Sequence, residues 1–388
     1  MKQIVGLILA SLFSGSLLLN CQDAAGQKAT GEKSYVVYVG TYSRQGSKGI
    51  YASRFSPASG TLSPLVLVAE TENPSFLATD PSGRFLYAVN EIGNYEGKNA
   101  GSVSAFSIDA SSGNLKFLNK VTTRGSIPCH LVVDKTGKCL VVANYGSGSV
   151  AAFPIKPDGG LGEASAFVQH EGSGVNARQK GPHAHMVQLS ADNRFILVPD
   201  LGADQVITYR LDPAKGSLVA EPTATHGTPG LGPRHLAFDP HGKFDYLINE
   251  MGSAVTAFRF SASSGGLTPL QTISTLSKEF AGSNNSAEIE VHPSGKFVYA
   301  SNRGDDSIAM FSANVKTGRL TPMGRVPTGG KTPRNFAIDP TGAYLLAANQ
   351  DSGTIITFRI DQVTGKLTPT GEQASLPQPV CILFMRPR

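Results

Sequence analysis

Tryptophan is absent from this sequence of 388 residues, cysteine occurs only four times, and lysine and arginine form no block. The 34 basic and 29 acidic residues leave a net charge of only +5, so we expect no groove dedicated to nucleic acid. The chain is rich in turn residues, with 43 glycines and 24 prolines. Because 40% of its residues are hydrophobic, collagen-like and disordered chains are excluded.

Several catalytic signatures are missing as well. No Gly-x-Ser-x-Gly motif indicates a serine hydrolase, and no glycine-rich dinucleotide fingerprint follows a strand. Gly330-Lys331-Thr332 is similar to the end of a phosphate-binding loop, but Pro333 would prevent the helix that such a loop requires. We therefore predict a reaction without a covalent serine intermediate and without a cofactor.

The N-terminal segment resembles an export signal. Lys2 precedes an apolar run from Ile4 to Leu19, which is short for a membrane span and typical of a signal peptide over residues 1–21. The run ends in a lipobox-like Leu-Leu-Asn-Cys sequence, so Cys21 is a candidate for lipidation. Two outcomes stay open, a periplasmic protein and a membrane-anchored lipoprotein, and the lipid would be the only membrane contact. Residues 22–33 are small and polar, which predicts a tether.

The other three cysteines show no pattern of a metal site or a disulfide. The spacing of Cys129, Cys139 and Cys381 matches no zinc motif. Cys129 and Cys139 flank one predicted hairpin, but its pairing does not place them opposite each other. We expect all three to be small buried hydrophobic residues.

An internal repeat is the strongest structural signal. Each copy begins with an apolar strand, makes a turn of the Asp-Pro-x-Gly type, and continues into a second strand that usually ends in Asn. A third strand, a Gly turn and a fourth strand follow. The copies begin 46 to 54 residues apart, at Pro74, Pro128, Pro182, Pro233, Ala287, Pro333 and Pro379.

Four short strands per repeat predict an all-β fold, a β-propeller built from four-stranded antiparallel blades. No stretch shows a helical period of 3.6 residues, which argues against an α/β fold. Residues 35–39 and 49–55 resemble a second and a third strand without a first one, and residues 380–384 supply it. The sequence therefore predicts one domain over 34–388 with seven blades, the first of which is closed by the C-terminal strand.

The propeller pattern predicts where chemically active side chains gather. The start of each first strand and the loop after each second strand meet on one face of a propeller, at the mouth of its channel. The positions after the repeat starts are Ser75, Cys129, His183, Arg234, Glu288, Arg334 and Val380. The positions after the second strands are Tyr42, Glu91, Tyr145, Leu201, Glu250, Arg303 and Gln350.

These positions are chemically diverse although the scaffold repeats, and diversity of this kind indicates a functional site. The preceding position is nearly always Asn, which instead indicates capping of loops. His183 and His185 are alternative catalytic residues, and because no third ligand has suitable spacing we predict no metal site. Arg234 and Arg303 are candidates for binding an anion or for pairing with a nearby glutamate. Four other histidines, at positions 170, 226, 241 and 292, are expected to face solvent.

The motifs that carry these residues resemble the seven-bladed β-propeller lactonase family. The resemblance rests on Pro182-His183-Ala184-His185, Gly232 to Phe238, Asn249-Glu250, Asn302-Arg303 and Pro333 to Phe336. It spans residues 35 to 386. The family includes propeller-type 6-phosphogluconolactonases and a fungal carboxymuconate lactonizing enzyme.

The resemblance implies an active site made of one histidine, two arginines and one glutamate. The matching residues are His185 or His183, Arg234, Glu250, and Arg303 with Arg334 as its rival. In a lactonase, Glu250 would act as the general base and an arginine would stabilise the oxyanion.

Residues expected to contact substrate are Glu91, Glu288, Arg334 and Asn335. We predict a monomer that hydrolyses a small sugar lactone. An export signal argues for an unphosphorylated substrate. The alternatives are a muconate-type cycloisomerase and a non-enzymatic surface propeller that binds glycans or proteins.

Overall fold

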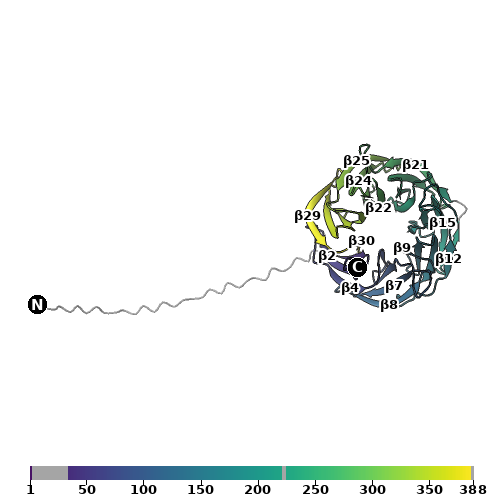
Figure 1. Ribbon diagram of the computed structural model, residues 1–388, viewed down its shortest axis with the longest axis horizontal. Coiled ribbons are helices and arrows are strands. Elements are labelled where there is room, and N and C mark those ends of the chain that lie inside the picture. Colours follow the sequence, from purple (N-terminus) through teal and green to yellow (C-terminus); the bar gives the residue numbers. More distant parts are fainter. Residues whose placement is uncertain (2–33, 221–223, 386–388) are drawn as a thin grey trace. The chain divides into compact units, whose positions relative to one another are not determined.

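In the part of the chain that the computed structural model describes, thirty β-strands form seven antiparallel sheets arranged in a ring (Figure 1). Apart from Met1, the structure describes residues 34–220 and 224–385. The predicted signal peptide (1–21) and tether (22–33) lie outside the described residues. The sheets confirm the all-β, seven-bladed propeller predicted from the repeat.

The first four blades follow the order of the sequence, apart from β30. Blade one contains β1 (Tyr35–Thr41), β2 (Gly49–Ser56), β3 (Thr61–Leu62), β4 (Val66–Glu70) and β30 (Pro379–Phe384). Blade two contains β5 (Leu77–Thr79), β6 (Phe85–Asn90), β7 (Ser102–Ile108) and β8 (Leu115–Thr122). Blade three contains β9 (Pro128–Val133), β10 (Cys139–Asn144), β11 (Ser149–Pro154) and β12 (Ala166–Gln169). Blade four contains β13 (Gln188–Leu189), β14 (Phe195–Asp200), β15 (Gln205–Asp212), β16 (Ser217–Ala220) and β17 (Thr225–His226).

The remaining three blades have four strands each. Blade five contains β18 (Pro233–Phe238), β19 (Phe244–Asn249), β20 (Ala254–Phe260) and β21 (Leu267–Ser274). Blade six contains β22 (Asn285–Val291), β23 (Phe297–Arg303), β24 (Ser307–Ala313) and β25 (Leu320–Pro327). Blade seven contains β26 (Pro333–Ile338), β27 (Tyr344–Asn349), β28 (Thr354–Ile360) and β29 (Leu367–Ser375). In blades one and four the outer strand is split in two, and both pieces pair with the third strand.

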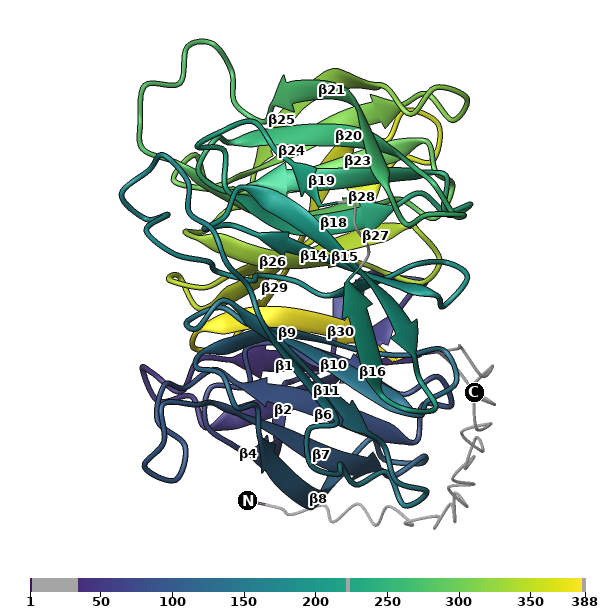
Figure 2. The ribbon, with the colours of Figure 1, turned by 90° about the vertical axis from the view of Figure 1, so that its right-hand side faces the viewer.

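The C-terminal strand closes the ring, as predicted. β30 pairs antiparallel with β1, from Val37 opposite Phe384 to Thr41 opposite Pro379, and Figure 2 shows the two strands side by side. The ring of Phe384 packs edge-on against Phe55, with centroids 5.3 Å apart. Blade one is thus built from both ends of the propeller sequence, so neither end leaves an open sheet edge at the channel.

The hydrophobic core is divided into seven clusters, and each lies between two neighbouring blades. Turn glycines make close contacts across these interfaces. A Cβ atom on Gly159 would lie 2.1 Å from the ring of Phe85 in the preceding blade, and one on Gly60 would lie 2.4 Å from Tyr344. Both glycines have positive φ angles, 85° and 79°. Only glycine satisfies the two requirements together, which explains the Gly turn in the repeat.

The Asp-Pro-x-Gly turns join the first two strands on the face away from the predicted site. Asp239 Oδ1 accepts hydrogen bonds of 2.6 Å from the backbone N–H groups of Lys243 and Phe244. Asp80 and Asp134 bind the equivalent N–H groups of their own turns. The aspartate therefore satisfies backbone donors that the hairpin leaves unpaired.

The asparagines that end the second strands cap loops, as expected. Asn144 Nδ2 donates to Thr123 O at 3.3 Å, and Asn349 Nδ2 donates to Thr328 O at 3.2 Å. Asn302 does the same with Thr275 O, at 3.2 Å. These side chains are fully buried, so the repeated asparagine has a structural role.

The three cysteines of the propeller are free and buried, as predicted. Two of the histidine predictions are wrong, because His170 and His292 are each only 3% exposed. His170 Nδ1 binds Asp200 at 2.7 Å, and His292 Nε2 binds Gly342 O at 2.9 Å. His226 and His241 are exposed. Within the described ranges, no helix is long and apolar enough to cross a membrane.

Candidate active site

A β-bulge at the start of several innermost strands brings side chains to one end of the channel. The register shifts between Pro233 and His235 in β18 and between Pro333 and Asn335 in β26. The residue inside each bulge is an arginine, Arg234 or Arg334. A bulge re-aims the extra side chain, and both arginines line a pocket at the channel mouth.

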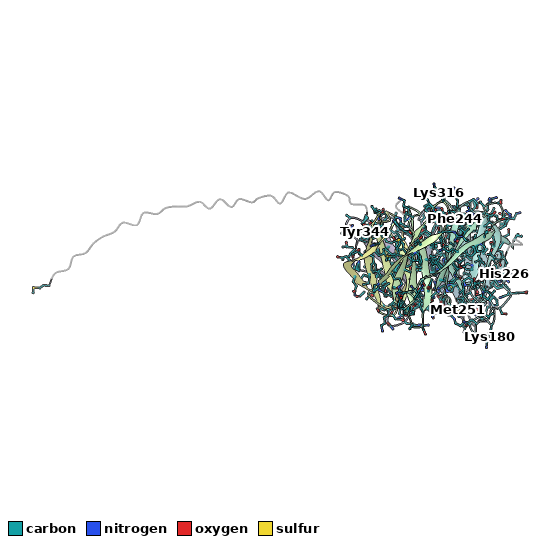
Figure 3. The ribbon with its side chains drawn as sticks, turned by 90° about the horizontal axis from the view of Figure 1, so that it is seen from above. Lys180, His226, Phe244, Met251, Lys316 and Tyr344 are labelled. Atoms are coloured by element: carbon teal, nitrogen blue, oxygen red, sulfur yellow. The ribbon has the colours of Figure 1, made fainter. Side chains whose placement is uncertain are left out.

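The pocket contains most of the predicted residues. It is lined by Ser75, Phe76, Glu91, Cys129, His185, Arg234, His235, Glu288, Arg334, Asn335 and Val380. It lies on the face that carries the loops after the second strands, where Figure 3 shows Met251 and Lys180. The Gly turn that contains Lys316 lies on the opposite face.

The strand register corrects the position of His183. Ala184 pairs with Asp200 as Pro233 pairs with Asn249, so His185 is the residue equivalent to Arg234. The spacing of the repeats predicts His183 at this position because the proline of blade four, Pro182, does not occupy the pairing position. His183 instead lies on the rim, where its Nδ1 contacts Tyr145 O at 2.9 Å and its ring stacks on Tyr145.

Glu250 is not among the residues that line this pocket, but it binds three arginines, one of which, Arg234, lines it. Its Oε2 binds Arg234 Nε at 2.9 Å and Arg303 Nη2 at 3.0 Å, and its Oε1 binds Arg178 Nη2 at 2.6 Å. The side chains of Arg234 and Glu250 are only 2% and 6% exposed. Of the two alternatives for Arg234 and Arg303, the structure shows the pairing with a nearby glutamate, and both arginines share one carboxylate oxygen of Glu250.

No pattern in the sequence indicates Arg178 as a site residue. It belongs to the loop between β12 and β13, outside the repeated strands, so no repeat position indicates it. Besides Glu250, it contacts Tyr145 Oη at 3.4 Å and Asn285 Oδ1 at 3.1 Å. Its side chain is 44% exposed, so this arginine covers the carboxylate from the solvent side.

The arginines keep Glu250 ionised. Burial acts to raise the pKa of Glu250, but Arg303, Arg234 and Arg178 outweigh burial and lower the pKa to about 2. Burial also lowers the pKa of Arg303 to about 10, which still leaves this arginine charged at neutral pH. A carboxylate with such a low pKa has little tendency to take up a proton.

His185 is a neutral neighbour of this cluster. Burial lowers the pKa of its imidazole well below the usual value, and Arg234 acts in the same direction. Its Nε2 lies 4.0 Å from Glu250 Oε2, beyond hydrogen-bonding distance. On the other side its Nδ1 lies 3.8 Å from Cys129 Sγ. Burial raises the pKa of the Cys129 thiol strongly, so Cys129 is no thiolate nucleophile.

A second cluster also reaches the pocket, which Glu91 and Arg334 line. The guanidinium of Arg334 lies over the ring of Tyr42, 5.3 Å from its centroid. Tyr42 Oη donates to Glu91, 2.8 Å from Oε1. In contrast to Arg234, Arg334 makes no hydrogen bond or ion pair to a carboxylate within 4.0 Å among the described residues. Arg334 is thus available to bind a ligand.

Glu288 and Asn335 each occupy the strand position directly after the bulge, whereas Arg334 is the bulge residue itself. Ser286 pairs with Asn302 and Ile289 with Ala300, so Ala287 is equivalent to Arg234 and Glu288 to His235. The prediction from the repeat spacing, which makes Glu288 equivalent to Arg234, is therefore wrong by one residue. Asn335 Nδ2 donates to Glu288 Oε2 at 2.5 Å. The two side chains predicted to contact substrate therefore bind each other.

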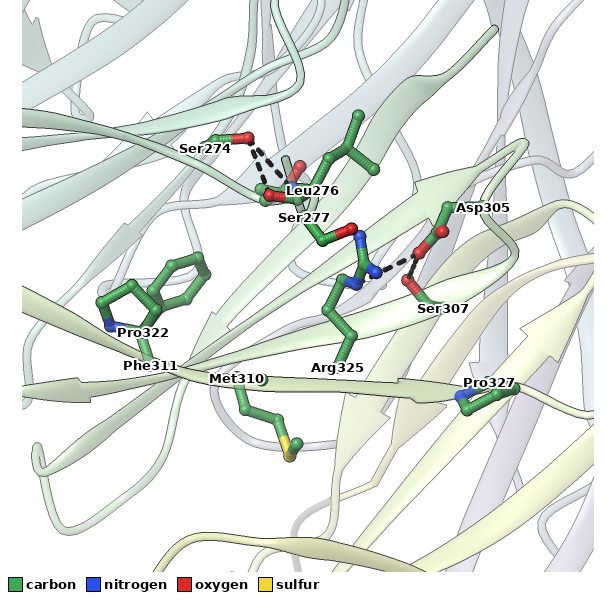
Figure 4. A pocket seen from close by; sticks show the side chains of 12 residues that line it. Ser274, Leu276, Ser277, Asp305, Ser307, Met310, Phe311, Pro322, Arg325 and Pro327 are labelled. Atoms are coloured by element: carbon green, nitrogen blue, oxygen red, sulfur yellow. Dashed lines mark hydrogen bonds and ion pairs between the residues drawn. The ribbon is translucent and has the colours of Figure 1, made fainter. Parts of the chain in front are cut away.

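A separate cleft of about 450 Å³ lies on blades five and six (Figure 4). Its lining includes Ser274, Phe311 and Arg325, and Arg325 Nε lies 3.5 Å from Asp305 Oδ2. None of the predicted site residues lines this cleft. Within the described ranges, no group of three His, Cys, Asp or Glu residues is arranged to hold a metal ion.

Comparisons with known proteins agree with this architecture. The family model "Lactonase, 7-bladed beta-propeller" matches residues 36–384. A 6-phosphogluconolactonase of Bacillus subtilis strain 168 is 36% identical over 351 residues, which cover 90% of this chain and 98% of the relative.

Two solved structures are similar over almost their whole length. The periplasmic gluconolactonase of Pseudomonas aeruginosa has a TM-score of 0.86 and 34% identity, covering 91% of this chain and 99% of that one. A protein of Bacteroides fragilis NCTC 9343 has a TM-score of 0.86 and 39% identity, covering 92% and 99%. The chain belongs to the seven-bladed β-propeller lactonase family.

Proposed function

We propose that the protein hydrolyses a sugar lactone at the mouth of the propeller channel. The observation that carries this proposal is the cluster in which one buried carboxylate, Glu250, binds Arg178, Arg234 and Arg303 beside a neutral imidazole, His185. Fixed positive charge next to a neutral histidine suits attack of water on a carbonyl group. Two similar proteins, named 6-phosphogluconolactonase and gluconolactonase, support the same reaction class.

The arginines are proposed to stabilise the oxyanion. When water attacks the lactone carbonyl, negative charge develops on the carbonyl oxygen. Arg234 donates through Nε to Glu250 and through Nη1 to Ala287 O, so its remaining nitrogen can face this oxygen. Arg303, whose side chain is 15% exposed, would bind the same oxygen from the solvent side. Preorganised donors of this kind contribute about 3 kcal/mol each to transition-state stabilisation.

Glu250 has a different role in this proposal from the one that the family resemblance implied. A general base works best with a pKa near the operating pH, and the pKa of Glu250 is about 2. Its carboxylate is better suited to orient Arg234 and Arg303 and to compensate their charge. A base for the attacking water must then come from another group of the pocket.

His185 is proposed to bind the ring oxygen of the lactone. It lies between the arginine cluster and Cys129, and its side chain is 6% exposed at the mouth. A neutral imidazole has one N–H donor, which can hold the ring oxygen in place as the C–O bond breaks. His183 stacks on Tyr145 at the rim, so it is the less suitable of the two histidines.

Arg334 is proposed to bind the far end of the substrate. It lines the mouth pocket and lies over the ring of Tyr42, which in turn donates to Glu91. An arginine can bind hydroxyl, carboxylate or phosphate oxygens. Because the first 21 residues resemble an export signal, we propose an unphosphorylated sugar lactone as substrate.

The test is turnover of a panel that contains glucono-δ-lactone, its 6-phosphate and carboxymuconate, with the spontaneous rate subtracted. Hydrolysis of the gluconolactones, fastest for the unphosphorylated one, is the expected result. Turnover of carboxymuconate alone would identify a cycloisomerase. If no compound is consumed, the alternative of a surface-binding propeller gains support.

Export, lipidation and a monomeric state are also proposals. The periplasmic gluconolactonase of P. aeruginosa is similar over almost its whole length, which supports export. Mass spectrometry of the mature N-terminus distinguishes cleavage at a simple signal from lipidation at Cys21. Light scattering of the purified protein measures its oligomeric state.

A further inference from the structure

A chain of three buried side chains lies directly below the mouth cluster. Asn335 Nδ2 donates to Glu288 Oε2 at 2.5 Å, and Glu288 Oε1 contacts His235 Nδ1 at 2.9 Å. The three residues come from β26, β22 and β18, so three separate blades contribute to the chain. Each is less than 8% exposed.

The backbone fixes the direction of these hydrogen bonds. Ile382 N–H donates to Asn335 Oδ1 at 2.8 Å, so the NH₂ group of Asn335 must face Glu288. Ile289 N–H donates to Glu288 Oε1 at 3.0 Å. Glu288 thus accepts hydrogen bonds on both oxygens, as an ionised carboxylate does. His235 Nδ1 must then carry the proton, and the lone pair is left on Nε2.

The Nε2 atom of His235 makes no hydrogen bond that would stabilise the described part of the fold. This atom is buried and has no hydrogen-bond partner among the described residues, although His235 lines the mouth pocket. Unpaired buried polar atoms are rare in native proteins and call for an explanation. The pocket leaves about 10 Å³ between its lining residues, close to the space that one water molecule requires.

Burial, more than the surrounding charges, keeps this imidazole neutral. Burial lowers the pKa of His235, Glu288 acts to raise it, and Arg234 and Arg334 act to lower it further. The rings of His130 and His185 also face it, with centroids 5.3 Å and 5.2 Å away. Glu288 stays ionised because His235 and Arg234 outweigh its burial and hold its pKa below the usual value. His235 is therefore a neutral base that is hydrogen-bonded to the ionised carboxylate of Glu288.

We propose that His235, oriented by Glu288 and Asn335, is the general base that activates the attacking water; this inference rests on the proposed lactone hydrolysis. The water oxygen bonds to the lactone carbonyl carbon while one water proton moves to His235 Nε2. The carbonyl π electrons move to oxygen beside Arg234. When the intermediate collapses, the bond between this carbon and the ring oxygen breaks, and the ring oxygen takes the proton back from His235.

The geometry favours His235 over the two other groups that could act as base. Glu250 binds three arginines, which stabilise its ionised form and make it a weak base. His185 has no carboxylate within hydrogen-bonding distance, among the described residues, to stabilise its protonated form. In the dyad of His235 and Glu288, the carboxylate stabilises the imidazolium that forms when the water proton arrives.

The first test variant is His235→Asn. The amide of the introduced asparagine can keep the hydrogen bond to Glu288, but the substitution removes the Nε2 atom. We expect kcat to fall about 100- to 10,000-fold with KM changed less than about threefold. The acid limb of the pH profile of kcat should disappear, and the residual rate should rise with hydroxide concentration.

The second variant exchanges the two polar partners, Glu288→Gln with Asn335→Asp. The introduced glutamine can still accept from His235 Nδ1 and donate to the introduced aspartate, and that aspartate can still accept from Ile382 N–H, so the number of hydrogen bonds is conserved. Only the negative charge moves away from His235. We expect a Tm within a few degrees of the wild type, a kcat at least about tenfold lower, and an acid limb shifted to lower pH. This variant decides the question if His235→Asn does not fold.

A matched control is His292→Gln, which removes a buried histidine that contacts Gly342 and Ser294 outside the pocket. It should lower Tm and leave the acid limb unchanged. The proposal is overturned if folded His235→Asn keeps a kcat within about threefold of the wild type, or if the exchange variant keeps both its kcat and its acid limb. A wild type that hydrolyses no lactone would instead refute the proposed function.

Discussion

The two faces of the propeller differ in the residues at the ends of the same strands. On the face of the Asp-Pro-x-Gly turns, the same residue types recur in several blades, and Asp80, Asp134 and Asp239 bind equivalent backbone N–H groups. On the mouth face, the bulge of the first strand holds Cys129, Arg234, Arg334 or Val380. Repetition thus marks positions that stabilise the blades, whereas diversity marks positions that are proposed to meet the substrate.

Among the variants that compare the two faces, the largest effect is expected on the mouth face. Glu250→Gln removes the charge that holds three arginines, so Arg234 and Arg303 lose their orientation toward the oxyanion. We expect kcat/KM for gluconolactone to fall about 100- to 1,000-fold. Removing one partner of a buried ion pair also destabilises the fold, by about 3 kcal/mol. Steady-state kinetics and urea unfolding measure the two effects, and activity close to that of the wild type would contradict the account.

The turn face should show the reverse behaviour. Asp239→Ala leaves the backbone N–H groups of Lys243 and Phe244 without a partner, which costs about 2–3 kcal/mol in the free energy of unfolding. Below the melting transition, kcat and KM should match those of the wild type. A large loss of activity in the folded variant would break the distinction between the two faces.

Arg334→Gln separates substrate binding from chemistry on the mouth face. The proposed contact to the far end of the substrate is the same in the ground state and the transition state, so its loss raises KM by about tenfold and changes kcat little. A product-inhibition constant should rise in parallel. A fall in kcat at constant KM would instead place Arg334 next to the reacting carbonyl.

The smallest effect concerns a half-buried carboxyl group away from the pocket lining. Burial raises the pKa of Glu290 to about 8, and the nearby Glu288 acts in the same direction. Folding therefore favours the protonated form, and the stability present at low pH is lost as pH rises from about 4.5 toward 8. Glu290→Gln, which stays neutral, should raise the free energy of unfolding by more than about 1 kcal/mol at about pH 9. At about pH 4 it should have little effect, and a pH-independent change would contradict the assignment.

The fold can be predicted from the sequence because each copy of the repeat corresponds to one blade. Each blade needs two neighbours to cover its hydrophobic faces, so strands 380–384 and 35–39 had to meet. The turn residues Asp80 and Gly83 also identify the hairpins without any knowledge of the structure. These features follow from the residue types in each turn and from the spacing of the repeats, and both can be read directly from the sequence.

The sequence predicts the site less completely because the bulges are invisible in it. His185 replaces His183 at the mouth because Ala184, rather than Pro182, takes the pairing position opposite Asp200. Glu288 moves one residue deeper for a similar reason. Arg178 comes from a loop that belongs to no repeat. Register and loop position arise from tertiary packing, which spacing alone does not encode.

The most direct test is a crystal structure of the protein with bound gluconate, the product of gluconolactone hydrolysis. We predict that the carboxylate of gluconate lies within about 3.2 Å of Arg234 or Arg303, with its far end toward Arg334. The carboxylate carbon should lie next to the small pocket space that His185 and His235 line. Gluconate bound in the cleft of Figure 4, with the mouth pocket empty, would contradict the account.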